Sequence, residues 1–116
     1  MAAAYGFPKA VRLRRRREYL SLQREGRRHH TPQFVVISRP GTGRVSRLGV
    51  TVSSRVGGAV ERNRIKRLVR EVFRLRRPAL GAIVELLVIA KPGAAQLRYA
   101  ETAEQLERAF ALAARR

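Results

Sequence analysis

The stretch from Gly57 to Arg77 constrains the fold of this chain more than any other part of the sequence. Five large apolar residues recur in it at the three- and four-residue spacing of a helix: Ile65, Leu68, Val69, Val72 and Phe73. At about 100° per residue they fall within an arc of about 140°. Burying each such side chain stabilises a fold by roughly 1.5–3 kcal/mol. The pattern therefore predicts an amphipathic helix that its apolar stripe can anchor.

The rest of this predicted helix is cationic. Gly58 is an acceptable N-cap, and Glu61 then lies three residues on, where a carboxylate suits the positive helix end. The polar surface carries seven residues, which Glu71 alone interrupts with a negative charge: Asn63, Arg64, Lys66, Arg67, Arg70, Arg74 and Arg77. A bound polyanion would relieve the repulsion among these cations, and a solvated basic face is the alternative interpretation.

The net charge also indicates a polyanionic partner. The 116 residues include 26 Lys and Arg against 8 acidic residues, for a formal charge of +18. Residues 1–82 hold 21 Lys and Arg against 4 Glu, whereas residues 83–116 hold 5 against 4. We therefore expect the partner to meet the first two-thirds of the chain and the last third to be scaffold.

Length and residue usage limit the class of protein. A chain of 116 residues predicts one domain, which we place at residues 11–116 after a flexible segment at residues 1–10. The sequence has no Cys, which excludes a disulfide framework, and no apolar run as long as a membrane span. We expect a cytoplasmic protein with no membrane partner.

Helices and strands alternate along the chain, which predicts an α+β fold. The expected helices are residues 16–25, ended by Gly26, then 58–77 and about 99–114. The expected strands are residues 33–39, 44–54 and 83–90. The last of these strands is nearly all apolar, so we expect it to be buried on both faces in the centre of the sheet.

Two features leave alternatives open. On the second expected strand, Gly49, Thr51 and Ser53 form a small polar face that could floor an open groove or simply face water. His29 and His30 are adjacent, so their side chains diverge and a shared metal ion is unfavourable. We interpret both as loop residues.

The first expected helix combines cations with an aromatic residue. Tyr19 stands close to arginines and could stack on an unpaired base, although simple packing is the commoner role of a tyrosine on a short helix. Four consecutive arginines stand at or before the start of the helix: Arg14, Arg15, Arg16 and Arg17. They favour a supporting contact to nucleic acid, and a disordered basic arm is the alternative.

The sequence shows no pattern of catalysis or metal binding by the chain itself. It contains no Asp and only scattered Glu, which makes a two-metal nuclease site implausible. It also lacks a Ser-His-acid spacing, a phosphate loop and a dinucleotide fingerprint. If the chain takes part in a reaction, another component carries the chemistry, and the protein alone is expected to bind no metal or cofactor.

The run from Arg62 to Arg70, RNRIKRLVR, resembles the signature of the bacterial ribonuclease P protein subunit. Further matches follow the family's order, among them Leu48 to Ser53, Gly57, and Val88 to Ala90 with Pro92. The resemblance implies an α/β sandwich of three helices and a mixed sheet of about four strands, with a left-handed βαβ crossover around the signature helix. One strand is therefore missing from the expectations above, and a split or bend in the strand at 44–54 is the candidate that we expect to account for it.

The resemblance also implies a function. The family's RNA subunit holds the catalytic Mg²⁺ and removes the 5′ leader from precursor tRNA, while the protein binds that RNA and grips the single-stranded leader between the first helix and the sheet. The implied contacts to the catalytic RNA are Arg62, Asn63, Arg64, Lys66, Arg67 and Arg70. The implied contacts to the leader are Tyr19, Phe34, Val36 and Arg55.

Three positions depart from the family's pattern. Gln23 stands where a second cleft aromatic is expected, Ser54 replaces one of two basic residues, and Gly58 replaces an Asn. These departures bear on how tightly the leader is held. The alternative function is a basic ribosomal or other structural RNA-binding protein. A DNA partner is not expected, because no second helix abuts the signature helix as in a helix-turn-helix.

Overall fold

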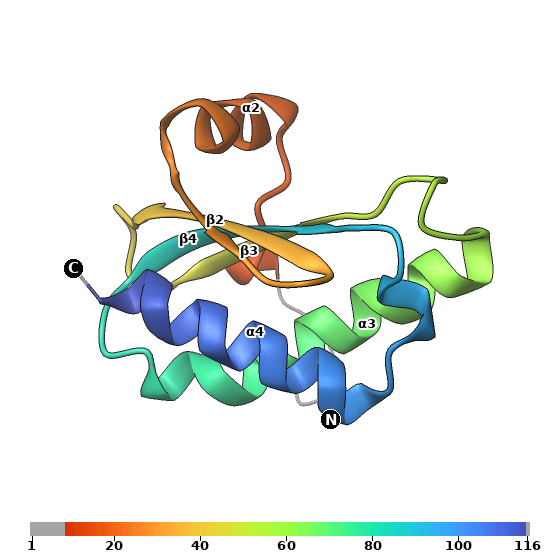
Figure 1. Cartoon of the computed structure of the whole chain (residues 1–116). Coiled ribbons are helices and arrows are strands. Elements are labelled where there is room, and N and C mark those ends of the chain that lie inside the picture. The colour runs from red at the N-terminus through yellow and green to blue at the C-terminus, as the bar shows by residue number, and fades with distance from the viewer. Residues whose placement is uncertain (1–8, 116) are drawn as a thin grey trace.

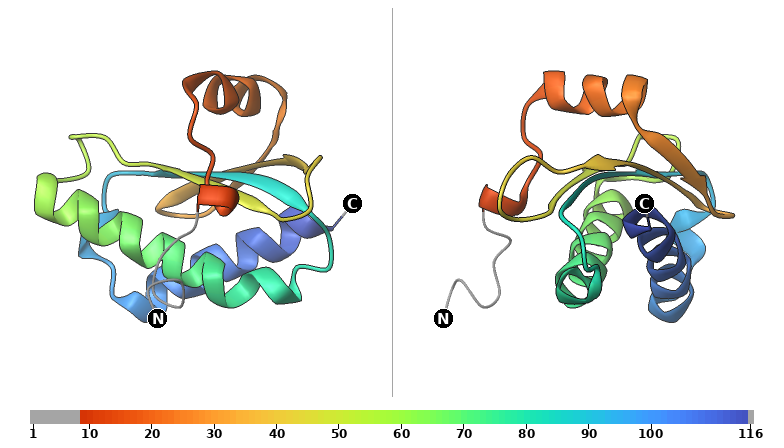
Figure 2. Two further views of the ribbon diagram at one scale, coloured as in Figure 1. Left: turned by 180° about the vertical axis from the view of Figure 1, so that it is seen from behind. Right: turned by 90° about the vertical axis from the view of Figure 1, so that its left-hand side faces the viewer.

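The computed structural model describes residues 9–115, which form three layers with the sheet in the middle (Figure 1). The strands are β1 (Arg27–His30), β2 (Phe34–Pro40), β3 (Arg47–Thr51) and β4 (Val84–Ala90). The helices are α2 (Arg16–Glu25), α3 (Ala59–Arg76) and α4 (Tyr99–Ala114), and the 3₁₀ turns are η1 (Lys9–Val11), η2 (Arg77–Ala79) and η3 (Ala94–Gln96). Helix α2 lies on one face of the sheet, and α3 and α4 cover the other (Figure 2).

The strand order is β1-β2-β4-β3. Strand β2 is antiparallel to β1 and to β4, whereas β3 and β4 are parallel neighbours that α3 connects. The sheet is therefore mixed, as expected, and β4 is one of its two inner strands. Six of the seven β4 residues are buried, which confirms the central strand predicted from its apolar run.

Strand β1 is the one that sequence patterning missed. It has the sequence RRHH, and the interpretation of His29 and His30 as loop residues is wrong. The strand 44–54 is neither split nor bent into two; it is the single, shorter β3. Charged residues on a short edge strand show no apolar alternation, because the backbone ladder to β2 holds the strand.

The larger core lies between the sheet and the two long helices. Helix α3 buries four residues of its predicted stripe there: Ile65, Val69, Val72 and Phe73. The ring of Phe73 meets that of Phe110 on α4 edge-on, with centroids 6.1 Å apart. No helix within residues 9–115 is long and apolar enough to cross a membrane.

The N-terminal part of the described chain crosses the edge of the sheet at β3. Arg12 forms an isolated bridge with Leu48. Val11 belongs to the core beneath α3 and α4, and Leu13 to a smaller core beneath α2. Of the segment predicted to be flexible, residues 1–8 lie outside the described residues, and residues 9 and 10 begin η1.

Candidate nucleic-acid interface

The strand register arranges the sheet face beneath α2 in three rows that run across the strands. The first row is charged: Arg47, Glu85 and Arg39. The second row is mostly apolar: Gly49, Leu87, Ile37 and Arg28. The third row is Thr51, Ile89, Val35 and His30. Each row begins on β3, and the second and third rows end on β1.

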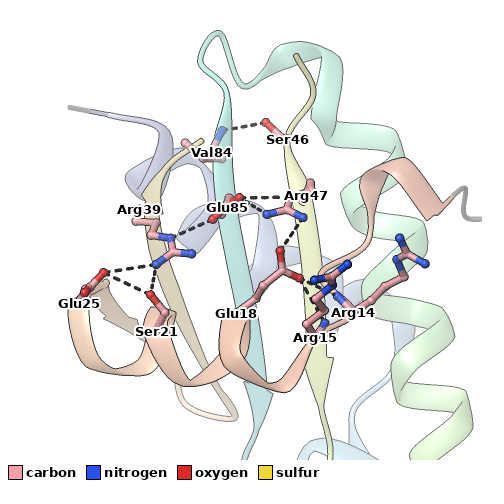
Figure 3. Close-up of polar contacts among 10 residues, drawn as sticks. All are labelled: Arg14, Arg15, Glu18, Ser21, Glu25, Arg39, Ser46, Arg47, Val84 and Glu85. Carbon is pink, nitrogen blue, oxygen red and sulfur yellow. Dashed lines mark hydrogen bonds and ion pairs between the residues drawn. The ribbon is translucent and has the colours of Figure 1, made fainter. Parts of the chain in front are cut away.

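The first row centres on a buried carboxylate. Glu85 is 4% exposed and accepts hydrogen bonds from Arg39 Nε at 2.8 Å and from Arg47 Nε at 3.1 Å (Figure 3). Burial raises the pKa of Glu85, but the hydrogen bonds from Arg47 and Arg39 outweigh it, so the net pKa lies below its ordinary value. Glu85 is therefore held in its charged form between two guanidinium groups.

Helix α2 is joined to this charged row near both ends. Near its start, Glu18 pairs with Arg47 Nη1 at 2.9 Å, and near its end Glu25 pairs with Arg39 Nη1 at 3.4 Å (Figure 3). We call these five residues the Glu85 clamp. Because Arg47 lies on β3 and Arg39 on β2, the clamp fixes α2 across the strands and not along them.

The second row is the part of the sheet on which α2 packs. A Cβ added at Gly49 would lie only 2.8 Å from Cζ of Tyr19, so the tyrosine ring rests directly on the β3 backbone. The Tyr19 hydroxyl donates to the Leu13 carbonyl at 3.1 Å. Burial raises the pKa of Tyr19. Leu22 is fully buried in the same small core.

Thr51, the β3 member of the third row, lines a groove beside α2. The groove has a volume of about 420 Å³ and is lined by Arg16, Tyr19, Leu20, Gln23 and Thr51. The four α2 residues among these recur at helical spacing, so they form one stripe along the helix. Gly49 and Thr51 thus settle the alternative left open by their small side chains: this part of β3 underlies α2 and its groove, whereas Ser53 is exposed.

Two residues expected to contact the leader point away from this groove. Phe34 and Val36 are 0% exposed and lie in the core beneath α3 and α4, so their placement as leader contacts is wrong. The apolar β2 residues on the α2 face are Val35 and Ile37, and both are buried in the small core beneath α2. The run FVVI does not alternate and conceals which residues face which side. Arg39 is four residues from Val35 and therefore lies on the same sheet face. The position of this arginine was the feature of the sequence that could have shown which β2 residues face which side.

The cationic face of α3 is not packed beneath other parts of the chain. Asn63 and Arg67 are exposed, and none of the four other signature residues named above is more than partly buried. The guanidinium of Arg64 donates to the Ala95 carbonyl, which ties α3 to η3 and fixes this arginine. Most of the signature is therefore available to an external partner.

Arg70 links the signature helix to the α2 side of the sheet. Burial lowers the pKa of Arg70, the charge of Arg12 lowers it further, and Tyr19 opposes this shift. Such coupling requires the Arg70 guanidinium to lie near both Arg12 and Tyr19, at the β3 edge. The surface of α3 and the groove beside α2 therefore meet around this edge.

The remaining predicted contacts are basic and exposed. Arg55 lies in the turn between β3 and α3. The four arginines at 14–17 are exposed, and the backbone N–H groups of Arg14 and Arg15 each donate to Glu18 Oε1 at 3.2 Å. Glu18 thus caps α2 and holds this arm in place. Within residues 9–115, no group of three or more His, Cys, Asp or Glu could hold a metal ion.

Comparison with known proteins places this arrangement in a family. Residues 7–114 match the family model described as Ribonuclease P. The chain is 44% identical over 107 residues to the ribonuclease P protein component of Desulfatibacillum aliphaticivorans, covering 92% of this chain and 91% of that protein. It is 47% identical over 90 residues to that of Dictyoglomus thermophilum, covering 77% and 74%.

Solved structures agree with the sequence relatives. The RNase P protein of Staphylococcus aureus superposes with a TM-score of 0.81 at 29% identity, covering 90% of this chain and 96% of that chain. The RNase P protein of Thermotoga maritima superposes with a TM-score of 0.80 at 30% identity, covering 87% and 96%. The α+β fold described above, with three helices and a four-stranded mixed sheet, is therefore shared with these RNase P proteins.

Proposed function

This chain belongs to the ribonuclease P protein family, and we propose that it binds the enzyme's RNA subunit through α3 and the 5′ leader of precursor tRNA through the groove beside α2. It is the protein subunit of ribonuclease P, the ribonucleoprotein that processes the 5′ end of precursor tRNA. Because the chain belongs to this family, the alternative of a basic ribosomal protein is set aside. The cytoplasm is the expected location.

The exposed face of α3 supports the contact to the RNA subunit. The side chains of Arg67 and Asn63 are exposed to solvent, and the planar guanidinium group of an arginine suits the phosphates of a folded RNA. Asn63 can hydrogen-bond a sugar or a base edge. Arg64 acts partly inside the protein, because its guanidinium already meets Ala95.

The groove suits a single strand of RNA. Thr51 lines it from the sheet, Tyr19 and Leu20 line it from α2 with an aromatic ring and an apolar side chain, and Arg16 adds a guanidinium group. Apolar and aromatic surfaces accept unstacked bases of any sequence, while a guanidinium meets the backbone. The observation that carries the proposal is the groove itself, which α2 lines with the aromatic ring of Tyr19 and the guanidinium group of Arg16.

The division of labour follows from the side chains present. The described residues offer no cluster of carboxylates, so we assign the catalytic Mg²⁺ to the RNA subunit and not to this chain. The protein supplies positive charge that offsets repulsion between the two RNAs. The β3–α3–β4 connection is proposed to have the left-handed crossover that the family resemblance implies.

Reconstitution tests this assignment. The purified chain, free of RNA, should not cleave precursor tRNA. Added to the cognate RNA subunit, it should lower the Mg²⁺ concentration needed for cleavage and increase affinity for precursor tRNA more than for mature tRNA, which lacks a leader. Cleavage by the RNA-free protein, or an equal gain in affinity for both tRNAs, would contradict the proposal.

Tyr19 provides the residue-level test of the groove. Tyr19→Ala should weaken binding of leader-bearing substrate by roughly tenfold, because the loss of one stacking platform removes about 1–3 kcal/mol. Tyr19→Phe keeps the ring on Gly49 and should bind nearly as well as the wild type. Filter binding of the holoenzyme to precursor tRNA measures both. A loss of assembly with the RNA subunit in Tyr19→Ala would argue against a role confined to the leader.

A further inference from the structure

Beyond the residues that line the groove, the sheet face beneath α2 continues to the edge strand β1, where none of the leader contacts considered above lies. The third row of the sheet ends there at His30, and the second row ends at Arg28. The pairing of Arg28 with Ile37 and of His30 with Val35 puts both on the sheet face that carries α2. Both side chains are exposed.

The groove-lining stripe of α2 leads toward this end. The helix starts above β3, where Glu18 meets Arg47, and its second half lies near β1, where Arg28 Nη2 donates to the Gln23 carbonyl at 3.1 Å. Gln23 is the last residue of the groove-lining stripe. A strand that follows the groove from Tyr19 past Gln23 therefore arrives at the Arg28 guanidinium.

The charge at this end is not neutralised inside the protein. Within residues 9–115, no ion pair joins Arg28 or His30 to a carboxylate. The nearby acid on α2, Glu25, pairs with Arg39 of the Glu85 clamp. The hydrogen bond to Gln23 uses one donor of the guanidinium and leaves the others for an external acceptor.

We propose that Arg28 and His30 form a phosphate-binding exit at the β1 end of the groove, which takes the leader nucleotides furthest from the cleavage site. The inference rests on the proposed function, because the β3 end of the groove adjoins the helix assigned to the catalytic RNA. The Arg28 guanidinium would grip a phosphate of the departing strand. The exposed His30 ring would offer a further face on which a base of the departing strand could stack.

Arg28 and His30 have a second possible role, the protection of an edge strand, which the test must distinguish from phosphate binding. Charged side chains on an edge strand prevent it from pairing with other chains, and that role needs charge of either sign. Arg27 offers a matched control, since it lies on the same strand, is also exposed and pairs with Ser38 on the opposite sheet face. Its Nη1 donates to the Arg115 carbonyl at the end of α4, away from the groove.

The test uses the reconstituted holoenzyme and precursor tRNAs whose leaders grow one nucleotide at a time. Wild-type affinity should rise with leader length and then level off. Arg28→Ala should bind short-leader substrates normally and lose roughly threefold in affinity for the longest leaders, with a salt slope lower by about 0.7. Arg28→Glu should lose more, and His30→Ala should show a smaller deficit at the same lengths.

The controls separate this inference from the function on which it rests. Arg27→Ala should match the wild type at every leader length. If Arg28→Ala also matches the wild type, if Arg27→Ala shows an equal deficit, or if Arg28→Glu binds as well as the wild type, the exit is wrong while leader binding in the groove stands. If wild-type affinity does not depend on leader length, the assignment of the groove itself fails.

Discussion

Glu85 shows how one residue determines the position of an entire helix. It is a nearly buried carboxylate in the middle of the sheet, and it holds the two arginines that the acids of α2 engage. The core on this side of the sheet is the smaller of the two, with five buried members. The charged row therefore acts together with the apolar packing on the second row to fix the position of α2, the wall of the groove.

The charged state of Glu85 makes stability depend on pH. Its pKa is lowered in the folded protein, so its stabilising effect is present near neutral pH and is lost as pH falls through the folded value. Glu85→Gln should lower the free energy of unfolding at pH 7 by about 2 kcal/mol and flatten its decline as the pH falls below about 5. Chemical denaturation across this range measures both effects.

A matched acid controls for general effects of charge. Glu104 is exposed on α4, and within residues 9–115 it takes part in no ion pair. Glu104→Gln should leave both the stability and its pH dependence close to those of the wild type. If Glu85→Gln retained the wild-type acid sensitivity, the pH dependence would have to arise from other carboxylates.

Gly49 is required by close approach and not by an unusual backbone angle. An added Cβ would lie 2.8 Å from Cζ of Tyr19 and 3.2 Å from Cβ of Leu13. Gly49→Ala should therefore displace the tyrosine ring, lower the free energy of unfolding by about 1–3 kcal/mol and weaken leader binding. Thermal unfolding and binding to precursor tRNA measure the two effects.

Gly43 is the natural comparison for Gly49. A Cβ added at Gly43 meets nothing within 4 Å, and this glycine does not have a positive φ. Gly43→Ala should be neutral or slightly stabilising, because alanine restricts the unfolded chain. Equal effects of the two substitutions would show that packing of Tyr19 on β3 does not set the position of α2.

At the scale of elements, α3 packs against the rest of the protein with one face and presents the other to the RNA subunit. Its apolar stripe is buried against the sheet and α4, whereas Leu68, one of the five residues of the predicted stripe, is only half-buried near the boundary of the stripe. Glu61 closes the N-terminus by accepting from the Gly58 N–H at 3.0 Å. The Asn-to-Gly departure at position 58 therefore leaves a capped helix.

Removing one exposed cation from α3 should weaken assembly with the RNA subunit. Arg67 is exposed and makes no ion pair within the described chain, so Arg67→Ala should reduce the slope of log affinity against log salt by about 0.9. Arg108, an exposed arginine on α4, is the matched control and should leave the slope unchanged. Salt titrations of holoenzyme assembly decide between these outcomes.

At the scale of the whole molecule, the sheet separates two kinds of surface. Residues 1–82 carry nearly all of the net charge, and their described part forms α2, the first three strands and α3. Residues 83–116 supply inner strand β4 and helix α4, which covers the sheet from the side opposite α2 (Figure 2). The electrostatic attraction for RNA is therefore concentrated on α2, β1 and α3.

The sequence by itself determined the elements whose residues carry a period. The three helices, the inner strand β4 and the cationic face of α3 follow from apolar spacing, and α2 ends at the residue predicted from Gly26. Gly26 has an extended backbone with φ of −78°. A glycine is needed at position 26 because a Cβ added there would lie 2.5 Å from Cγ2 of Ile37. The element was predicted correctly, but the reason for its glycine was not.

Only the tertiary structure decided which side chains face one another. Strand β1 has no apolar alternation, since it is held by backbone hydrogen bonds to β2, and the parity of FVVI in β2 depends on which layer covers each face. The Glu85 clamp joins acids and arginines from four elements that are distant in the sequence. Sequence periodicity reports how much of a side chain is buried, whereas the partner of a buried charge is set by strand order and register.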